Sequence, residues 1–409
     1  MQVLVLAQYY APEPVPKPAE VAEELTRRGH SVTVLTGFPN YPSGALAAGY
    51  RLGPFLREVI HGVPVLRVFE VPYHGRSAFW RSLNYLSFDF AAAMAAYAIP
   101  RPDIIYVFLP PLTVGVSAWL LSALRRTPFV CDLQDIWPDE AIMSGMMREG
   151  LISRSLRVLE RFVYSRASHL LVITEEARDN ILQKGVADHR ISVLPHWYPA
   201  EQSFEQPPRA EVLEQARRDL RAGDQFVVTF AGNLGLVQGL STVLEAASRL
   251  RSRSDIAFRF IGDGSDRQRL ERMARELKLE TVAFLGQRPS VQMAPLLAAS
   301  DALLVQAAPG PLNQLLLPTK TLAYLAAGRP VIAAMDGATA TLIREADAGL
   351  TVPPGDPVAL ANAIQRLAGL SRAQLADMGR RGRRFVAERF DKSRIMDRLE
   401  AVLTEHARA

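Results

Sequence analysis

The chain has 409 residues, enough for two domains of ordinary size, and its composition of 49% hydrophobic and 22% charged residues excludes an intrinsically disordered protein. The net charge of +5 is spread over both halves, which excludes the concentrated basic field of a nucleic-acid-binding protein, so no nucleic acid is expected as a partner. A single cysteine, Cys131, and a start without a signal-peptide pattern predict a cytoplasmic protein without disulfides.

The first half alternates between strand-like and helical segments. A helix is expected at residues 18–30. Strands are expected at residues 2–7, 31–36, 103–109, 128–133, 169–174 and 191–195. Nearly continuous apolar strands joined by helices form parallel sheets covered on both faces, so we predict a Rossmann-like α/β domain over residues 1–200.

The loop after the first strand, in "LAQYYAPEPVPKPAE", contains four prolines and no glycine. A dinucleotide-binding site would need glycines here so that the backbone can approach the pyrophosphate. The loop is expected to form one wall of a cleft, with Glu13 as a candidate acceptor-binding residue, or to be a plain structural loop.

Residues 104–124 carry no charge and are long enough to cross a bilayer. The prolines Pro110 and Pro111 in the middle, after a strand-like run, instead favour a buried strand, a loop and a buried helix.

The segment "CDLQDIWPDE" places several acids around Trp137 directly after a predicted strand. Carboxylates accept hydrogen bonds from sugar hydroxyls, and an aromatic ring packs on a sugar face. The alternative is that the acids cap the next helix and that the tryptophan is a core residue. The candidate acceptor-binding residues here are Gln134, Asp135 and Trp137, with Asp132, Asp139 and Glu140 beside them.

Two segments are candidates for contact with an anionic membrane surface. Residues 79–99 are apolar and aromatic, and residues 148–166 carry five arginines on a helical pattern. The alternative is a packed helix with a solvated basic face. The localisation expected is therefore cytoplasmic, with peripheral contact to the inner face of the plasma membrane left open.

After a Pro-rich linker at 195–211, the alternation restarts. Strands are expected at residues 225–232, 256–264, 282–286, 301–307 and 330–335. A second Rossmann-like domain is therefore predicted over residues 201–385, and a C-terminal helical segment, 386–409, is expected to pack back on the first domain. Two such domains form a cleft in which ligands bind at the carboxyl ends of strands.

Two glycine-containing turns of this half each lie between a strand and a helix. In "FAGNLGLVQGL", Gly232 and Gly235 allow the backbone to approach a ligand, and the following helix offers unpaired amides to an anion. In "FIGDGSDRQRLE", Gly262 precedes Asp266, which is expected to cap the helix. The alternative for both is an ordinary structural turn.

The stretch "PTKTLAYLAAGRPVIAA" predicts a helix that begins at Pro318 and Thr319. Lys320 in its first turn is electrostatically misplaced unless an anion binds there, and Thr319 or Thr321 offers a hydroxyl. Together with the loop at residues 232–238, this helix is expected to hold a diphosphate without a metal ion or other cofactor.

Together these motifs resemble the retaining, nucleotide-sugar-dependent glycosyltransferases of family 4, which have the GT-B fold. The forms "QDIWP" and "PTK" are most similar to bacterial enzymes that transfer fucose or N-acetylfucosamine-type sugars in colanic acid and O-antigen assembly. The resemblance implies a nucleotide-sugar donor, most simply UDP-linked, and a glycan or polyprenyl-diphosphate-linked acceptor. It implies that the catalytic residues are Lys320 and Asp135, and that the donor-binding residues are Gly232, Asn233, Gly235, Gln238, Gly262, Gln287, Arg288, Thr319, Lys320 and Thr321.

The chain departs from the family pattern at several positions. The two glutamates usual around the diphosphate-binding helix fall at Leu315 and Ala323, and the second commonly binds the ribose hydroxyls. A catalytically weak or inactive sugar-nucleotide-binding subunit is therefore kept as an alternative. A sugar-nucleotide epimerase of the same fold is a further alternative, but such enzymes need several acids and histidines in the cleft, and the donor loops lack them.

Overall fold

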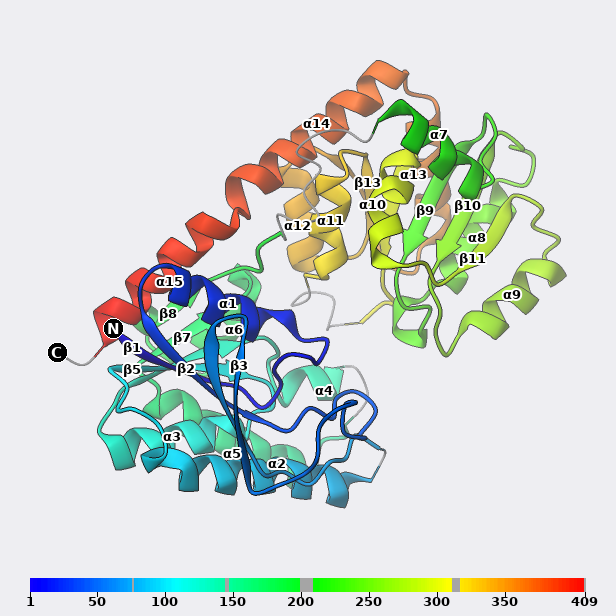
Figure 1. Ribbon diagram of the computed structural model, residues 1–409. Coiled ribbons are helices and arrows are strands. Elements are labelled where there is room, and N and C mark those ends of the chain that lie inside the picture. Colours follow the sequence, from blue (N-terminus) through cyan, green and yellow to red (C-terminus); the bar gives the residue numbers. More distant parts are fainter. Residues whose placement is uncertain (76, 144–146, 199–208, 311–316, 408–409) are drawn as a thin grey trace. The chain divides into compact units, whose positions relative to one another are not determined.

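The computed structural model describes residues 1–75, 77–143, 147–198, 209–310 and 317–407. The chain divides into two compact units (Figure 1). The first comprises Met1–Pro195 and Ser393–Ala409, and the second comprises His196–Lys392. The C-terminal segment is therefore part of the same unit as the N-terminus.

The first unit is built on an eight-stranded sheet with the order β3-β4-β2-β1-β5-β6-β7-β8. All neighbouring pairs are parallel except β3 with β4, which form an antiparallel hairpin at the sheet edge. The strands are β1 Gln2–Leu6, β2 Ser31–Gly37, β3 Phe55–Ile60, β4 Val63–Val68, β5 Ile104–Leu109, β6 Phe129–Leu133, β7 His169–Val172 and β8 Ile191–Val193.

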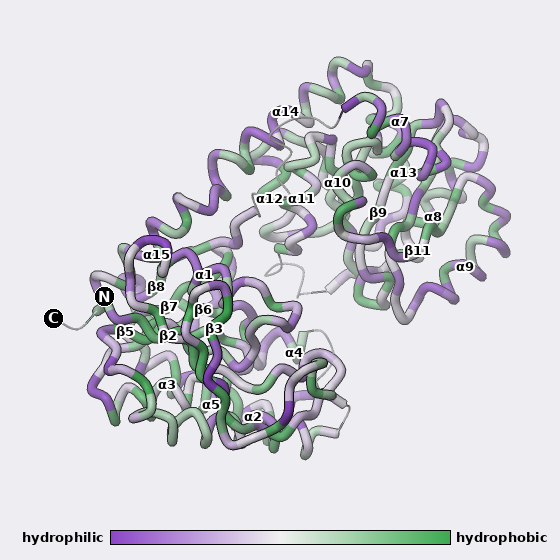
Figure 2. The backbone as a smooth tube through the Cα atoms, viewed as in Figure 1, coloured by the Kyte–Doolittle hydropathy of each residue, from purple (hydrophilic) through white to green (hydrophobic). Residues whose placement is uncertain are grey.

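Helices cover both faces of this sheet. One layer contains α2, α3 and α5, and the opposite layer contains α1, α6 and α15 (Figure 1). The helices are α1 Pro16–Arg27, α2 Ala78–Met94, α3 Val114–Arg125, α4 Asp139–Met143, α5 Leu151–Arg166, α6 Glu175–Gln183 and α15 Lys392–His406, with short 3₁₀ turns η1 Ala95–Tyr97 and η2 Asp188–Arg190. In Figure 2 the central strands of this unit are hydrophobic, as expected for strands buried on both faces.

Helix α15 is fastened to the first unit by ionic contacts. The Arg28 guanidinium donates to Asp397 at 2.6 Å and to Glu400 at 2.8 Å, and His30 lies 2.8 Å from Glu400. The buried side chains of α15 are Ile395, Met396, Leu399 and Leu403. An apolar face and a charged seam therefore join chain segments that are far apart in sequence.

The second unit has a six-stranded, fully parallel sheet with the order β11-β10-β9-β12-β13-β14. Its strands are β9 Phe226–Ala231, β10 Ile256–Ile261, β11 Val282–Gly286, β12 Ala302–Gln306, β13 Val331–Ala334 and β14 Gly349–Thr351. Its helices are α7 Ala210–Asp219, α8 Ser241–Arg249, α9 Arg267–Glu276, α10 Ser290–Ala299, α11 Thr319–Ala326, α12 Gly337–Glu345, α13 Pro357–Ala368 and α14 Arg372–Arg389, with the 3₁₀ turn η4 Leu236–Gln238.

The second sheet separates two hydrophobic cores. Helices α7, α10, α11, α12 and α14 pack on one face, around strand residues such as Val227 and Leu303. Helices α8, α9 and α13 pack on the other, around Val228 and Leu304. Successive residues of one strand thus face opposite cores, which defines a doubly wound α/β arrangement.

The predicted α/β class with two Rossmann-like domains is confirmed, and every predicted strand is present. Residues 104–124 form β5 and most of α3, as expected, and no helix in the described ranges is long and apolar enough to span a membrane. The sequence pattern did not identify β3, β4 or β14. Asp266 occupies the N-cap position of α9, as expected, but its side chain makes no bond to a helix amide, because its carboxylate instead accepts from Arg269 at 2.6 and 2.7 Å.

Candidate functional site

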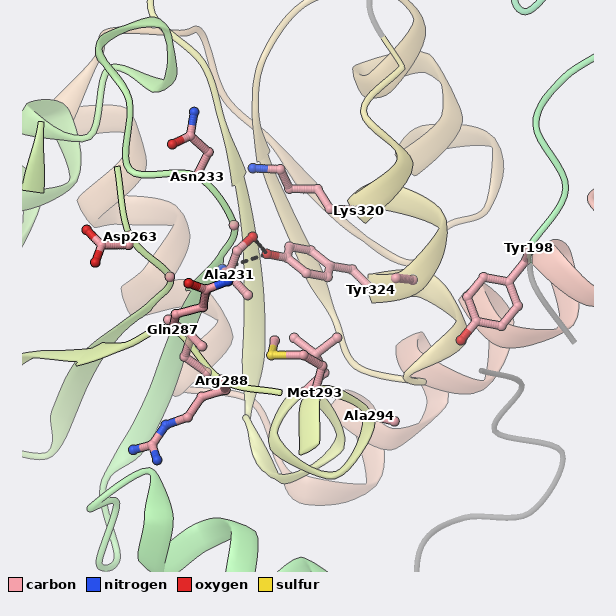
Figure 3. Close-up of a pocket in the computed structure, with 15 residues that line it drawn as sticks. Tyr198, Ala231, Asn233, Asp263, Gln287, Arg288, Met293, Ala294, Lys320 and Tyr324 are labelled. Carbon is pink, nitrogen blue, oxygen red and sulfur yellow. Dashed lines mark hydrogen bonds between the residues drawn. The ribbon is translucent and has the colours of Figure 1, made fainter. Parts of the chain in front are cut away.

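A pocket of about 490 Å³ lies in the second unit at the carboxyl ends of β9, β10 and β11 (Figure 3). Its residues at the strand ends and in the loops that follow are Ala231, Gly232, Asn233, Ile261, Gly262, Asp263, Gln287 and Arg288. Its helix and linker residues are Met293, Ala294, Leu297, Lys320, Ala323, Tyr324 and Tyr198. Ligands of open parallel sheets bind at this end of the strands, so the position suits a binding site.

The loops after β9 and β10 touch through their backbones. Gly232 and Gly262 have φ angles of +139° and +137°, which favour glycine. A Cβ atom on Gly262 would lie 1.9 Å from the carbonyl oxygen of Gly232. The Gly232 amide donates to Ile261 at 2.8 Å, and the Gly262 amide donates to Gly286 at 2.9 Å. The glycines therefore permit a close backbone floor beneath the pocket.

Helix α11 is attached to the end of β9 by Tyr324. Its buried hydroxyl accepts from the Ala231 amide at 2.7 Å and donates to the Ala231 carbonyl at 2.9 Å (Figure 3). Arg383 of α14 donates to the carbonyls of Ala326 and Ala327 at the C-terminal end of α11, at 3.1 and 3.2 Å. The C-terminal half of α11 is thereby held to the end of β9 and to α14.

Lys320 extends from the first turn of α11 toward the Gly232 loop (Figure 3). Its Nζ atom lies 4.2 Å from the centre of the Phe230 ring and donates to Oε1 of Gln238 at 3.1 Å. Burial lowers the pKa of this ammonium to about 8. No carboxylate within the described ranges lies at ion-pair distance from it. A partly desolvated cation at a helix N-terminus is suited to hold an anion.

The structure brings most predicted donor residues together. Gly232, Asn233, Gly262, Gln287, Arg288 and Lys320 all line the pocket. Gln238 reaches it through its hydrogen bond to Lys320, whereas Gly235 does not line it. Thr319 is exposed and Thr321 is buried, and neither lines the pocket. Leu315 lies outside the described residues, and Ala323 is part of the pocket wall.

Several pocket residues were not identified from the sequence. Met293, Ala294 and Leu297 of α10 form an apolar wall, and Tyr198 approaches from the segment before α7. No motif in α10 signals a ligand, because these residues look like any buried helix face. Burial raises the pKa of the Tyr198 hydroxyl to about 12, so it is a neutral donor at physiological pH.

In the first unit, the segment after β6 carries the predicted acceptor residues. Asp132 is fully buried and is held by Lys17 at 2.8 Å and by the Gln134 side-chain amide at 2.6 Å. The Tyr106 hydroxyl also donates to it. The Gln134 side chain is thus engaged in orienting a buried carboxylate. Lys17 lies in the first turn of α1, and its charge is balanced by the buried carboxylate of Asp132 rather than by a ligand.

Asp135 and Glu140 form a second acidic group beside Trp137. Burial raises the pKa of Asp135. Burial and the neighbouring Asp135 raise the pKa of Glu140 to about 7. Oε1 of Glu140 accepts from the Ile136 amide at 2.8 Å, and Trp137 is half-buried. Two neighbouring carboxyls with raised pKa values are suited to bind a hydroxyl group or to exchange a proton with it.

Glu13 has a clear structural role in the first loop. Its buried carboxylate accepts hydrogen bonds from the backbone amides of Tyr10, Asn40 and Tyr41, at 2.9, 2.8 and 2.8 Å. It therefore connects the loop after β1 to the loop after β2. Its predicted contact with an acceptor remains a prediction. Within the described ranges there is no group of three or more His, Cys, Asp or Glu side chains that could hold a metal ion.

Comparisons with known proteins agree with this arrangement. Residues 17–197 match the family described as "Glycosyl transferase 4-like domain", and residues 225–369 match "Glycosyl transferases group 1". The chain is a glycosyltransferase, with a 4-like domain followed by a group 1 domain. This glycosyltransferase is 28% identical over 337 residues to the putative colanic acid biosynthesis glycosyl transferase WcaI of Escherichia coli, covering 80% of the chain and 82% of WcaI.

Two further similarities extend the comparison. The probable glycosyltransferase WbjE of Pseudomonas aeruginosa is 28% identical over 283 residues, covering 68% of this glycosyltransferase and 70% of WbjE. The solved structure of Anabaena HepE in complex with UDP superposes with a TM-score of 0.76, at 20% identity, over 99% of this chain and 100% of HepE. The predicted GT-B fold is thereby confirmed.

Proposed function

We propose that this glycosyltransferase moves a sugar, with retention of configuration, from a UDP-linked donor to a cell-surface polysaccharide or its polyprenyl-linked precursor. The proposed donor rests on one observation. Lys320, at the start of α11, is a partly desolvated ammonium that has no carboxylate partner within the described ranges. HepE is solved in complex with UDP, which supports a UDP-linked donor. WcaI is described as a putative colanic acid biosynthesis enzyme, which supports a polysaccharide acceptor.

The donor diphosphate would lie between Lys320 and the loop that starts at Gly232. Because burial lowers the pKa of Lys320 only to about 8, the side chain is still mainly charged at pH 7. A bound diphosphate would restore the electrostatic stabilisation that the ammonium lost on burial. The nucleoside would lie toward Gln287, Arg288 and the apolar wall of α10.

In the transfer step, the bond from the anomeric carbon to the diphosphate breaks, and a bond to the acceptor oxygen forms on the same face. The proton of the acceptor hydroxyl passes to an oxygen of the departing diphosphate, so no protein nucleophile is required. Lys320 stabilises the negative charge that develops on that leaving group. Asp135, with Glu140 beside it, would accept a hydrogen bond from the acceptor and orient it.

The donor and acceptor pair is tested by incubating the protein with a panel of nucleotide sugars and glycan acceptors and measuring nucleotide release. Lys320→Ala is expected to reduce release by at least about 100-fold, because it removes the charge facing the diphosphate. Lys278→Ala is the matched control, since Lys278 follows α9 in the same unit and does not line the pocket. Unchanged release by Lys320→Ala would contradict the proposal.

A further inference from the structure

A second cavity, an apolar groove of about 840 Å³, lies in the first unit between the β3–β4 hairpin and α2. The hairpin side includes Leu66 and Val68, and the helix side includes Phe90, Ala91 and Met94. Its volume falls within the range of about 300–1,000 Å³ that is typical of small-molecule sites. Nothing in the proposed donor site uses these residues.

The groove continues into an exposed apolar stripe along α2 and the following turn η1. Phe79, Leu86, Phe90, Met94 and Tyr97 are 69, 59, 70, 69 and 72% exposed. They recur every three, four or seven positions and therefore lie on one side of the helix. Phe90 and Met94 both line the groove and stand in this stripe. Contiguous apolar surface of this kind marks a binding surface.

The charged residues around the groove indicate which class of ligand it binds. The only acid of α2, Asp89, is buried and accepts from Ser117 at 2.5 Å. Arg57 lines the groove and donates to the Ala98 carbonyl at 2.7 Å, and Arg51 is exposed immediately before the groove residue Leu52. No acidic side chain is among the described residues that line it. Apolar surface bordered by cations is complementary to an anionic lipid.

We infer that this groove binds the isoprenoid chain of a phosphorylated lipid acceptor, with Arg51 and Arg57 near its phosphate. The exposed α2 stripe then contacts neighbouring hydrocarbon when the lipid is in a bilayer. The inference rests on the proposed function only in identifying the lipid as the acceptor. A protein partner is disfavoured, because protein interfaces carry about one hydrogen bond per 100–200 Å² and the stripe offers almost no polar side chain for them.

The test is calorimetric titration of the full chain with farnesyl phosphate, a soluble isoprenyl phosphate, and with inorganic phosphate alone. Ala91→Trp places a large side chain in the groove, and Ala93→Trp is the matched control, because Ala93 is partly exposed on α2 and does not line the groove. We expect wild type and Ala93→Trp to bind farnesyl phosphate equally, Ala91→Trp to bind at least tenfold more weakly, and none to bind phosphate. Thermal unfolding and UDP binding, measured in parallel, show that each variant is folded.

Three results would overturn the inference. The first is equal farnesyl phosphate binding by wild type and Ala91→Trp, or none by either. The second is that wild type and Ala91→Trp both float with phosphatidylglycerol vesicles but neither binds farnesyl phosphate. That result would indicate contact with a bilayer surface alone. The third is that wild type dimerises, that Ala91→Trp abolishes the dimer, and that farnesyl phosphate does not affect it. That result would show that the groove binds a second copy of the chain. Farnesyl phosphate binding without nucleotide release from any donor would instead refute the proposed function and leave the groove assigned.

Discussion

The Lys320 ammonium lies 4.2 Å from the centre of the Phe230 ring, at the point where β9 leads into the Gly232 loop. The ring face offers some electrostatic stabilisation to a cation that burial has partly desolvated. It does not replace an anion, since the pKa of Lys320 is still lowered to about 8. The free pocket is thus prepared for a negatively charged ligand.

The affinity for UDP should depend on pH through Lys320. Only protonated Lys320 attracts the diphosphate. The affinity for UDP is therefore highest well below pH 8 and falls as the pH rises through about 8. One pH unit above this pKa about one tenth of the free protein is competent, so the Kd should rise about tenfold between pH 7 and 9. The terminal phosphate of UDP is largely ionised at pH 7. Calorimetry on wild type and Lys320→Arg tests this, because the arginine variant should show a flat profile.

Gly262→Ala should disrupt the floor of the donor pocket. The added Cβ would meet the Gly232 carbonyl oxygen at 1.9 Å, and the backbone has a φ of +137°. We expect a loss of about 1–3 kcal/mol in the free energy of unfolding and much weaker UDP binding. Gly223→Ala is the control, since Gly223 has a φ of +50° and a Cβ added there would meet no atom within 4 Å. Equal behaviour of the two variants in denaturant titration would show that the close backbone contact is unimportant.

Ala323 lines the pocket where related enzymes commonly carry a glutamate that binds the ribose. Ala323→Glu should therefore create discrimination between UDP and its 2′,3′-dideoxy analogue. We expect the ratio of their dissociation constants to be near one in wild type and to rise at least about fivefold in the variant, the equivalent of one hydrogen bond. Ala323→Leu, which adds bulk without acceptors, is the control. A large ratio in wild type would mean that another residue already binds the ribose.

Asp135→Asn should separate acceptor chemistry from donor binding. Asp135 belongs to the first unit and is absent from the donor pocket, so UDP affinity should stay the same. Loss of a positioned carboxylate should slow sugar transfer by about 100-fold or more. Glu175→Gln, at an exposed position of the same unit, should leave transfer unchanged. Full transfer activity in Asp135→Asn would show that the Asp135 carboxylate has no role in the reaction.

The sequence predicted both sheets because their strands are long apolar runs between helical segments. The β3–β4 hairpin escaped recognition, since β3 is an edge strand with mixed polar and apolar residues, several of them exposed. It is this hairpin that completes the apolar groove over α2. The hypothesis that residues 79–99 contact a membrane surface anticipated the exposed stripe but not the groove.

Pocket residues were predictable from the sequence where a local motif marks them, as with Gly232, Gly262 and Lys320. Residues brought in from a distance were not, because Tyr324 and Ala231 are 93 positions apart in the chain. The prediction for Thr319 and Thr321 neglected helix geometry. Successive residues point about 100° apart around a helix, so residues 319, 320 and 321 do not face one pocket together.

The most direct test of the donor assignment is a crystal structure of the protein with UDP. We predict diphosphate oxygens within hydrogen-bond distance, about 2.7–3.2 Å, of Lys320 Nζ and of backbone amides in the loop that begins at Gly232. UDP bound elsewhere, or with its diphosphate remote from Lys320, would contradict the assignment.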